Sequence, residues 1–433
     1  MQAIGKYRWT ICSLVFFATT INYLDRAVIS LLKDTLEDQF HWTESDYSDI
    51  VIAFQVSYAA GMLIMGRVID KLGTKIGYAV SILAWSLAAI GHAVVKTTLG
   101  FVIARSALGI SEAGNFPSAI KTTAEWFPKR ERALATGIFN SGANVGAILA
   151  PLTVPLIEAK WGWEMAFILT GAIGFLWLIF WFAFYEIPAK HKKLKKEEYE
   201  YIHSDVDEKP SDDGLVEDKG KVSWIRLLGF RQTWAFVMGK FLTDPVWWFY
   251  LFWLPAFLKA QYGIEGTGVM LPIALVYTMS TVGSIFGGWL PLHFIRKGWA
   301  VYRSRKTSMF IYALFALPVL FAQLLGETSM WLAVIIIGIA ASAHQAWSAN
   351  IFTTVSDMFP KKAVGSVTGM GGTAGALGGI LIAALAGKLF DHFKAIGKLE
   401  TGYYIMFLVC GGAYLLAWGV MHFLVPKMKR VEI

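Results

Sequence analysis

Residues 125–149 read EWFPKRERALATGIFNSGANVGAIL, and residues 357–381 read DMFPKKAVGSVTGMGGTAGALGGIL. Aligned without gaps, the two stretches are identical at eight positions, among them Phe-Pro-Lys and Thr-Gly. The offset of 232 residues, from 125 to 357, places one copy in each half of the chain. A repeat of this kind predicts two halves of one architecture, arranged as parallel repeats around a shared central site.

The composition around this repeat is that of a membrane protein. Of the 433 residues, 56% are hydrophobic and only 16% are charged, whereas about 25% are charged in a soluble domain. Apolar stretches long enough to cross a bilayer recur along the chain, without the alternation of a β-barrel. We therefore predict an all-α membrane protein with twelve transmembrane helices at 9–33, 47–67, 76–95, 99–121, 133–156, 164–186, 232–258, 268–292, 305–325, 329–354, 364–388 and 402–425.

The first apolar stretch starts at Trp9 and contains Asp25 and Arg26. No small-residue cleavage site follows it, so we interpret it as helix 1 and not as a signal peptide. The two cysteines, Cys12 and Cys410, lie inside apolar spans and show no metal-ligand spacing. We expect no disulfide, no metal and no cofactor.

The formal net charge of +8 does not indicate nucleic-acid binding, because the basic residues fall in short loops that orient the chain in its membrane. The first loop on the opposite side is acidic. By the positive-inside rule, both termini and the loop 187–231 are cytoplasmic. The basic clusters lie at Lys71 and Lys75, 129–132, 190–196, 296–306, Lys361 and Lys362, and 427–430.

The repeat and the loops give a domain organisation. We predict an N-terminal six-helix bundle over 1–186, a cytoplasmic linker over 187–231 and a C-terminal six-helix bundle over 232–433. The linker is the one long polar segment, and its mixed charge with Pro and Gly is typical of a solvated connector.

Four ionisable residues lie within predicted membrane spans, where each costs about 2.5 to 3.5 kcal/mol and calls for a partner or a water-filled cavity. Asp25 and Arg26 are in helix 1, and Arg105 and Glu112 are in helix 4. A spacing of seven residues puts Arg105 and Glu112 on one helix face. In one interpretation, guanidinium groups bind a carboxylate while buried carboxylates take up and release protons. In the other, the charges form only interhelical salt bridges.

Several polar side chains lie within reach of these charges. Asn22 is three residues before Asp25 and four before Arg26 on the same helix. Tyr58 in helix 2 and Asn140 or Asn144 in helix 5 are further candidate hydrogen-bond donors to a substrate.

Helix 7 contains the sequence DPVWWFYLFWLP, with Pro245 and Pro255 expected to break or bend it. Its aromatic block supplies Trp247, Trp248 and Tyr250 as candidate substrate contacts, for stacking on the apolar face of a sugar. An interfacial aromatic belt and simple packing are the alternatives. Asp244, four residues after Lys240, is interpreted as a paired structural charge.

Helix 10 places His344, Trp347 and Asn350 at spacings of three. The repeat offset puts His344 opposite Glu112. His344 and Trp347 are candidate substrate contacts, although a membrane histidine is often only a packed hydrogen-bond donor. The Gly-rich stretch 369–379 lacks the Lys of a phosphate-binding loop, so we predict that it allows close helix packing.

The loop GRVIDKLGTK after helix 2 resembles the signature loop of the major facilitator superfamily. Gly66, Asp70, Lys71 and Gly73 match it, and the resemblance implies that they act at a conformational gate. The copy in the second half is degraded, because Leu292 stands where the Asp is expected. The resemblance implies two pseudo-symmetric six-helix halves.

Within that superfamily, NYLDR in helix 1, RSALGISEA in helix 4 and WFPKRER before helix 5 are similar to the anion:cation symporter family. This resemblance implies Asp25 and Glu112 as protonation sites and Arg26 and Arg105 as carboxylate partners. It also implies substrate contacts from Tyr23, Tyr58 and an Asn of helix 5. The chain departs from the sugar-acid permeases in helix 11, where a Gly/Ala/Thr stretch replaces an expected Asn.

The helix 7 block looks most like bacterial hexuronate permeases, which implies the cytoplasmic membrane as location. The resulting hypothesis is a monomeric proton-coupled symporter that imports glucuronate or galacturonate by alternating access, partnered only by substrate, protons and lipid. Another organic anion such as galactonate, or exchange in place of symport, stays open. A membrane sensor is the second class of function, and the absence of an appended signalling domain argues against it. An enzyme is the third class, and the absence of a recognisable catalytic cluster argues against it.

Overall fold

The computed structural model describes residues 5–204, 222–264 and 266–432. Long α-helices dominate these residues, as the apolar runs predict. The membrane-length helices and their segments are α1 (Tyr7–Leu31), α3 (Glu44–Leu72), α4 (Thr74–Gly91), α5 (Thr98–Glu112), α6 (Asn115–Trp126), α7 (Lys129–Trp161), α8 (Trp163–Phe184), α11 (Arg231–Tyr262), α12 (Met270–Arg296), α13 (Val301–Ala316), α14 (Ala322–Gly326), α15 (Met330–Met358), α16 (Lys361–Ala395) and α17 (Leu399–Leu424). Shorter helices are α2 (Lys33–Phe40), α9 (Lys196–Ile202) and α10 (Trp224–Leu228), with 3-10 turns η1 (His92–Val94), η2 (Pro188–Lys190), η3 (Gly266–Val269) and η4 (Leu317–Phe321).

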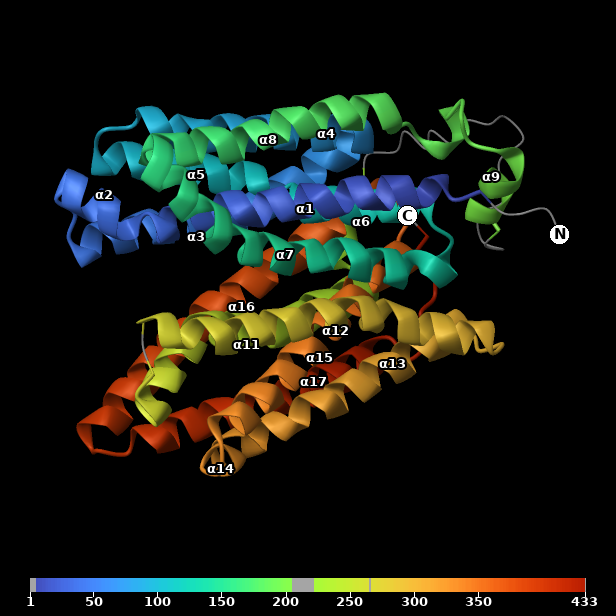
Figure 1. The fold of residues 1–433 in the computed structure, drawn as a ribbon. Coiled ribbons are helices and arrows are strands. Elements are labelled where there is room, and N and C mark those ends of the chain that lie inside the picture. Colours follow the sequence, from blue (N-terminus) through green and yellow to red (C-terminus); the bar gives the residue numbers. More distant parts are fainter. Residues whose placement is uncertain (1–4, 205–221, 265, 433) are drawn as a thin grey trace.

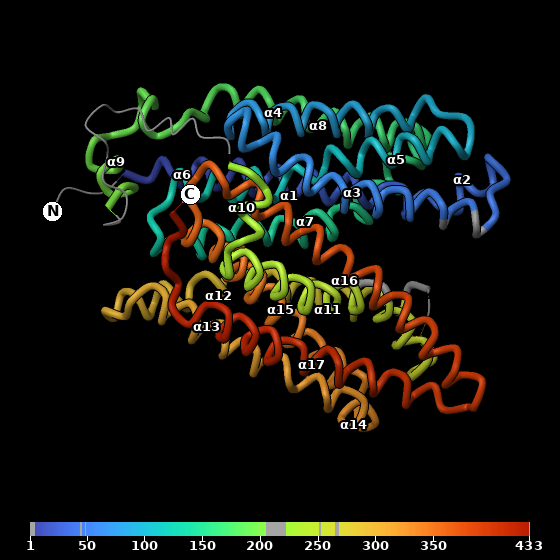
Figure 2. Tube along the Cα trace, turned by 180° about the vertical axis from the view of Figure 1, so that it is seen from behind, coloured from blue at the N-terminus to red at the C-terminus, as the bar shows by residue number. Residues whose placement is uncertain are grey.

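The helices form two bundles that lie side by side (Figure 1). One bundle contains α1 to α8 and the other contains α11 to α17. Both views place α9, the start of α1 and the segment after α17 at one end of the molecule, which we call the linker face. The bundles are close together there and diverge toward the end that carries α2 and α14, which we call the open face (Figure 2). The predicted architecture of two six-helix halves is confirmed.

Ten of the described helices are long and apolar enough to cross a membrane. The two remaining crossings are α5 with α6, which are short segments of one span, and α11, which contains Lys240 and Asp244 in its middle. Together they give the twelve spans predicted from the sequence.

The prediction of one continuous helix over 99–121 is wrong. The span breaks at Ala113 and Gly114, between α5 and α6. Pro117 explains the break, because it has no N–H and its ring clashes with the carbonyl of Ala113 four residues earlier in a continuous helix. A Cβ on Gly114 would lie 2.2 Å from the Ser81 hydroxyl oxygen, so only glycine allows α4 to approach this closely.

Proline acts differently in two other spans. The predicted helix 305–325 is interrupted by η4, in which Pro318 is the second residue. By contrast, α11 continues through both Pro245 and Pro255, so neither proline breaks it, and the alternative of a bend stays a prediction.

The two halves meet through glycine-rich helix faces. A Cβ on Gly137 of α7 would lie 2.2 Å from the Ser284 carbonyl oxygen of α12, and one on Gly66 of α3 would lie 2.4 Å from the Gly365 carbonyl oxygen of α16. Within the C-terminal half, Gly371 and Gly378 bring α16 equally close to α11. The prediction that the 369–379 stretch serves helix packing is confirmed.

Buried charges close the linker face across the halves. The Arg132 guanidinium donates to the Ser356 carbonyl at 2.6 Å and lies 3.7 Å from Asp357. Arg305 forms an ion pair with the same Asp357 and donates to the Lys129 carbonyl at 2.5 Å. These contacts join the start of α7 to the end of α15, so the halves are locked together at this end.

The linker is not solvated throughout, which corrects the sequence-based prediction for its first part. Glu198 of α9 is buried and accepts from the Arg8 guanidinium at 3.0 Å and from the Tyr7 and Arg8 backbone N–H groups at 3.1 Å each. Arg8 also pairs with Glu131 of α7 at 2.8 Å. The α9 helix therefore caps α1. Residues 205–221 of the predicted linker lie outside the described residues, and its last part, from 222, contains α10.

Candidate functional site

The four charges singled out in the sequence meet between α1 and α5. The Arg26 guanidinium lies 3.1 Å from Glu112 Oε2 through both Nε and Nη2. Glu112 is fully buried, and its Oε1 has no hydrogen-bond partner among the described residues. The interhelical salt-bridge interpretation therefore holds for this pair, while leaving one carboxylate oxygen without a partner.

Three aromatic rings surround the Arg26 guanidinium. Its carbon lies 4.6 Å from the ring centres of Tyr23 and Tyr58 and 5.0 Å from that of Phe54. Guanidinium groups stack favourably on aromatic faces, so the rings hold the cation in place as water is excluded. The resemblance implied Tyr23 and Tyr58 at the site, and the structure places both against Arg26.

The other two charges have fewer partners. Arg105 donates to the Arg26 carbonyl at 3.2 Å and stacks on Phe54 at 4.8 Å, but its Nε and Nη1 have no hydrogen-bond partner among the described residues. Asp25 is buried, and neither of its carboxylate oxygens has such a partner. The Thr170 hydroxyl of α8, which lies near Asp25, donates to the Phe167 carbonyl at 3.4 Å. Buried charges left in this state are expensive and typical of functional sites.

The candidate amides behave differently from one another. Asn22 accepts from Arg26 at 3.3 Å and donates to the Glu112 carbonyl at 3.5 Å, so it links α1 to α5. Asn140 donates to Gln345 at 2.7 Å and to Ser284 at 3.2 Å, so it belongs to the contact between the halves. Asn144 is buried, and both its amide atoms lack a hydrogen-bond partner in the described part of the chain.

The C-terminal half contributes an aromatic wall. The ring of Trp247 stacks on His344 at 5.2 Å, and His344 Nδ1 shares a hydrogen bond of 2.7 Å with the Tyr414 hydroxyl. Trp347 is fully buried and packs edge-on against Tyr414 at 5.6 Å. His344 is thus packed and hydrogen-bonded through Nδ1, as one of the two interpretations predicts. A contact between His344 and a substrate stays a prediction.

The helix 7 aromatic residues divide between packing and a cavity. Trp248 packs on α16, where a Cβ on Gly379 would lie 2.5 Å from its ring. Trp247 and Tyr250 line a cavity of about 200 Å³ between α11 and α12, shared with Leu254, Pro255, Ile273, Val276 and Tyr277. The buried Tyr250 hydroxyl has no partner among the described residues. The packing interpretation therefore fits Trp248, whereas stacking of a sugar on Trp247 or Tyr250 stays a prediction.

Asp244 pairs with Lys240 at 2.7 Å within α11, which confirms the paired-charge prediction.

At the predicted gate, Asp70 accepts from the backbone N–H groups of Gly365 at 3.0 Å and Ser366 at 2.6 Å and pairs with Lys121 at 3.0 Å.

The other three predicted gate residues, Gly66, Lys71 and Gly73, lie in different surroundings from one another. Gly66 lies in the same contact between α3 and α16. Lys71 is exposed, and Gly73 forms the turn to α4 with φ of 78°. Only Asp70 and Gly66 thus touch the opposite half.

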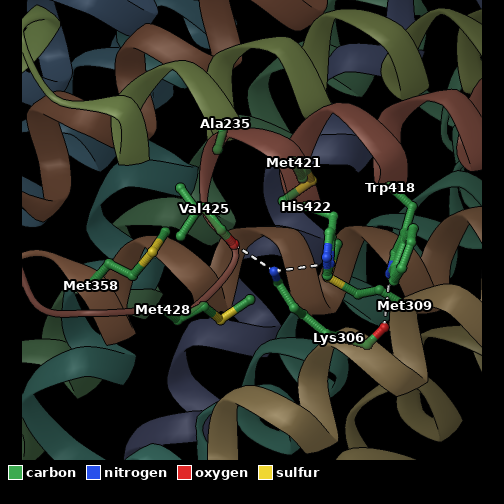
Figure 3. Close-up of a pocket in the computed structure, with 9 residues that line it drawn as sticks. All are labelled: Ala235, Lys306, Met309, Met358, Trp418, Met421, His422, Val425 and Met428. Carbon is green, nitrogen blue, oxygen red and sulfur yellow. Dashed lines mark hydrogen bonds between the residues drawn. The ribbon is translucent and has the colours of Figure 1, made fainter.

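A second, small cavity of about 20 Å³ lies at the linker face, away from the four charges (Figure 3). Its lining includes four methionines, and Lys306 donates to the Val425 carbonyl at 2.5 Å beside it. This volume is close to that of one water molecule, so the cavity is too small for an organic substrate.

Sequence reasoning missed Phe54, Gln345 and Tyr414. Phe54 lies four residues before Tyr58 and contacts both arginines, and helical spacing was the signal that could have found it. Gln345 is adjacent to His344 but joins the opposite half. Tyr414 belongs to no motif, so only the fold brings it to His344.

Comparison with known proteins places the chain in a family. Residues 15–383 match the Major Facilitator Superfamily model. The hexuronate transporter of Escherichia coli K12 is 31% identical over 392 residues, which are 90% of this chain and 89% of that protein. The galacturonate transporter of Dickeya chrysanthemi is 34% identical over 294 residues, 68% of this chain and 84% of that protein. A D-galactonate transporter of Escherichia coli O6:H1 is 26% identical over 401 residues, 90% of each protein.

Solved structures show the same fold. The proton:xylose symporter XylE superposes with a TM-score of 0.76 at 16% identity, covering 98% of this chain and 97% of that one. The Escherichia coli fucose:proton symporter FucP gives 0.69 at 14% identity, covering 98% of this chain and 100% of that one. The chain is therefore a multi-pass membrane protein that belongs to the Major Facilitator Superfamily, whose members are transporters, and resembles its hexuronate transporters.

Proposed function

We propose that this protein is a proton-coupled symporter that imports a hexuronate, galacturonate or glucuronate, by alternating access. The observation that carries the proposal is the group of four buried charges, in which Arg26 is bound to Glu112. Both oxygens of Asp25 and two of the three guanidinium nitrogens of Arg105 lack hydrogen-bond partners among the described residues. The names of the hexuronate and galacturonate relatives support the substrate class. The galactonate relative makes an aldonate the second candidate.

Charge balance supports the coupling. With all four groups ionised, two guanidinium groups and two carboxylates sum to zero. A substrate carboxylate would leave this buried site with one net negative charge, which is costly in a low-dielectric environment. Protonation of Asp25 or Glu112 restores neutrality. Binding of the anion and binding of a proton therefore favour each other.

The competition for Arg26 supplies the release step. Glu112 occupies the guanidinium that a substrate carboxylate needs, since both oxygens of an incoming carboxylate fit the two donors aligned on Glu112. When Glu112 is protonated, Arg26 is free for substrate. When Glu112 loses its proton, it pairs with Arg26 again and displaces the substrate carboxylate. The two conformational states therefore bind substrate with different affinities when Glu112 is protonated in one and ionised in the other.

The arrangement of the halves fits one state of the cycle. The linker face is locked by Asp70, Arg132, Arg305 and Asp357, and the halves diverge toward the open face (Figure 2). If the basic loops make the linker face cytoplasmic, this is a state that receives substrate and protons from outside. Rocking of the halves then requires these contacts to break.

The test is uptake of labelled galacturonate, glucuronate and galactonate into proteoliposomes, with and without an inward proton gradient. Wild-type uptake is expected to follow the gradient. Glu112→Gln mimics the protonated group permanently, so it should lose gradient-driven uptake and keep exchange of labelled for unlabelled substrate.

Glu131→Gln is the matched control, because Glu131 is also a buried carboxylate paired with an arginine but lies at the linker face. It is expected to retain the gradient response. Uptake by the wild type that ignores the proton gradient would refute the coupling. Uptake of galactonate alone would replace hexuronate by the second candidate.

A further inference from the structure

The Lys240–Asp244 pair of α11 has no place in the coupling scheme above. Both residues lie in the middle of a membrane span, and their charged atoms are 2.7 Å apart. An ion pair at this depth is costly to bury and is weak evidence for stability alone. Its position and its surroundings indicate a role in binding.

The pair is on the wall that faces the Arg26 site. Asp244 packs against Gly375 of α16, and two residues earlier in α16 the Thr373 hydroxyl donates at 2.8 Å to the Ala59 carbonyl of α3, next to Tyr58, one of the rings against Arg26. The Asp244 side chain is 18% exposed, whereas that of Lys240 is 5% exposed. The carboxylate is therefore the accessible member of the pair, and the ammonium lies behind it.

Neighbouring helices fix the pair from two sides. The Lys240 ammonium lies 4.0 Å from the ring centre of Phe352, which stacks at 5.2 Å on Phe116 of the opposite half. On the other side, a Cβ on Gly375 would lie 2.1 Å from Asp244 Oδ2, so the carboxylate packs directly on the backbone of α16. One turn along α11, Trp247 stacks on His344. The wall thus presents a fixed acceptor beside an aromatic ring.

We propose, resting on the proposed function, that Asp244 binds hydroxyl groups of the sugar acid and that Lys240 is its positioning residue. An ionised carboxylate accepts hydrogen bonds from two neighbouring hydroxyls, and Trp247 offers a surface for the sugar ring. Because Lys240 neutralises Asp244, the wall does not repel an anionic substrate as a whole.

This arrangement selects a substrate class. The carboxylate of the substrate binds at Arg26 and Arg105, and its other end meets the Asp244 oxygens. A second carboxylate at that end would face Asp244 directly, and like charges at close range are strongly unfavourable. The protein therefore selects sugar acids with one carboxylate over diacids such as galactarate.

The test measures competition against labelled galacturonate uptake in proteoliposomes, with unlabelled galacturonate and unlabelled galactarate as competitors. The ratio of their inhibitory concentrations does not depend on how much protein is active. Asp244→Asn removes the negative charge, replaces one of the two acceptor oxygens by an amide donor and frees the Lys240 ammonium for a second carboxylate. We expect the KM for galacturonate to rise about tenfold and galactarate to become about tenfold more potent.

Lys240→Met/Asp244→Asn removes both charges together, so it leaves no buried ion alone. It should show the raised KM for galacturonate without the gain for galactarate, which separates binding by Asp244 from attraction by Lys240. Glu37→Gln is the matched control, because Lys33 and Glu37 form a pair of the same spacing on α2, outside the central site. Its ratio should equal that of the wild type.

An unchanged ratio for Asp244→Asn would overturn the proposal, since a merely structural pair affects both competitors alike. If that variant does not fold, the double variant decides: a raised KM for galacturonate supports the proposal, and a wild-type KM overturns it. Absence of any sugar-acid uptake by the wild type would overturn the proposed function, and this inference with it.

Discussion

The two halves share one architecture but treat the ionisable groups of the candidate site differently, although the Tyr250 hydroxyl and the Trp347 indole of the C-terminal half also lack hydrogen-bond partners among the described residues. In the N-terminal half, Asp25, Arg105 and Asn144 keep side-chain atoms without hydrogen-bond partners in the described residues. In the C-terminal half, His344 shares a hydrogen bond with Tyr414, and Asp244 pairs with Lys240.

Unsatisfied buried groups are costly and persist where a ligand or proton completes them, while satisfied groups keep a fixed shape. The difference indicates that the N-terminal half supplies changeable charge to the site and the C-terminal half supplies a fixed wall. Repeat symmetry at the level of helices therefore does not extend to chemistry. His344 and Glu112, which correspond by the repeat offset, illustrate this: one is tied to Tyr414 and the other to Arg26.

The sharpest way to break this comparison is Arg26→Ala. The substitution removes the carboxylate partner and leaves Glu112 buried without its cation, a loss of about 3 to 5 kcal/mol. We expect uptake and substrate affinity to fall at least about a hundredfold. Uptake assays and equilibrium binding on purified protein measure this, and Arg8→Ala, at the linker face, is the comparison. Retained affinity in Arg26→Ala would remove Arg26 from the site.

Asp25→Asn tests whether the unpartnered carboxylate carries a proton. The amide cannot be protonated at neutral pH, so the response of uptake to an inward proton gradient should fall about thirtyfold. The measurement compares initial rates at fixed inside pH and varied outside pH. A full pH response in Asp25→Asn would leave Glu112 as the group that couples proton and substrate.

In the C-terminal half, His344→Phe keeps a ring against Trp247 but leaves the Tyr414 hydroxyl buried without its partner, at a cost of about 1 to 3 kcal/mol. We expect the KM to rise about tenfold with an unchanged proton-gradient response, because this wall carries shape. Tyr414→Phe removes the same hydrogen bond from the other side, and the double variant should add little to either change. A lost gradient response in His344→Phe would contradict the division between the halves.

The smallest expected effects distinguish two asparagines one helical turn apart. Asn144→Ala removes amide atoms that have no partner in the described residues, and the KM should rise about fivefold. Asn140→Ala instead removes contacts to Gln345 and Ser284 across the halves.

Asn140→Ala should therefore change the maximal rate and the thermal stability while leaving the KM close to wild type. Uptake kinetics and unfolding curves on the two variants separate these outcomes. The reverse pattern would place Asn140 and not Asn144 at the substrate.

Much of the site could be predicted because charges within apolar spans stand out in the sequence. The free-energy cost of placing an ionisable side chain within a membrane span was enough to identify Asp25, Arg26, Arg105 and Glu112. All four lie in the same region of the N-terminal half. The break after Glu112 was missed, although Pro117 gives its local cause. Tyr414 and Gln345 were missed because neither differs from a residue that simply packs in a membrane helix.

By itself, the sequence determined the twelve spans, the two related halves and the presence of expensive buried charges, because hydrophobic length and local composition act along the chain. Only the tertiary structure decided which charges pair. Glu112 forms an ion pair with Arg26, whereas Asp25 has no hydrogen-bond partner among the described residues. The tertiary structure also decided that α9 caps α1 through Glu198. These outcomes depend on which helix faces approach one another. Glycine allows the close approach, but a local pattern of glycines does not specify which helix packs there.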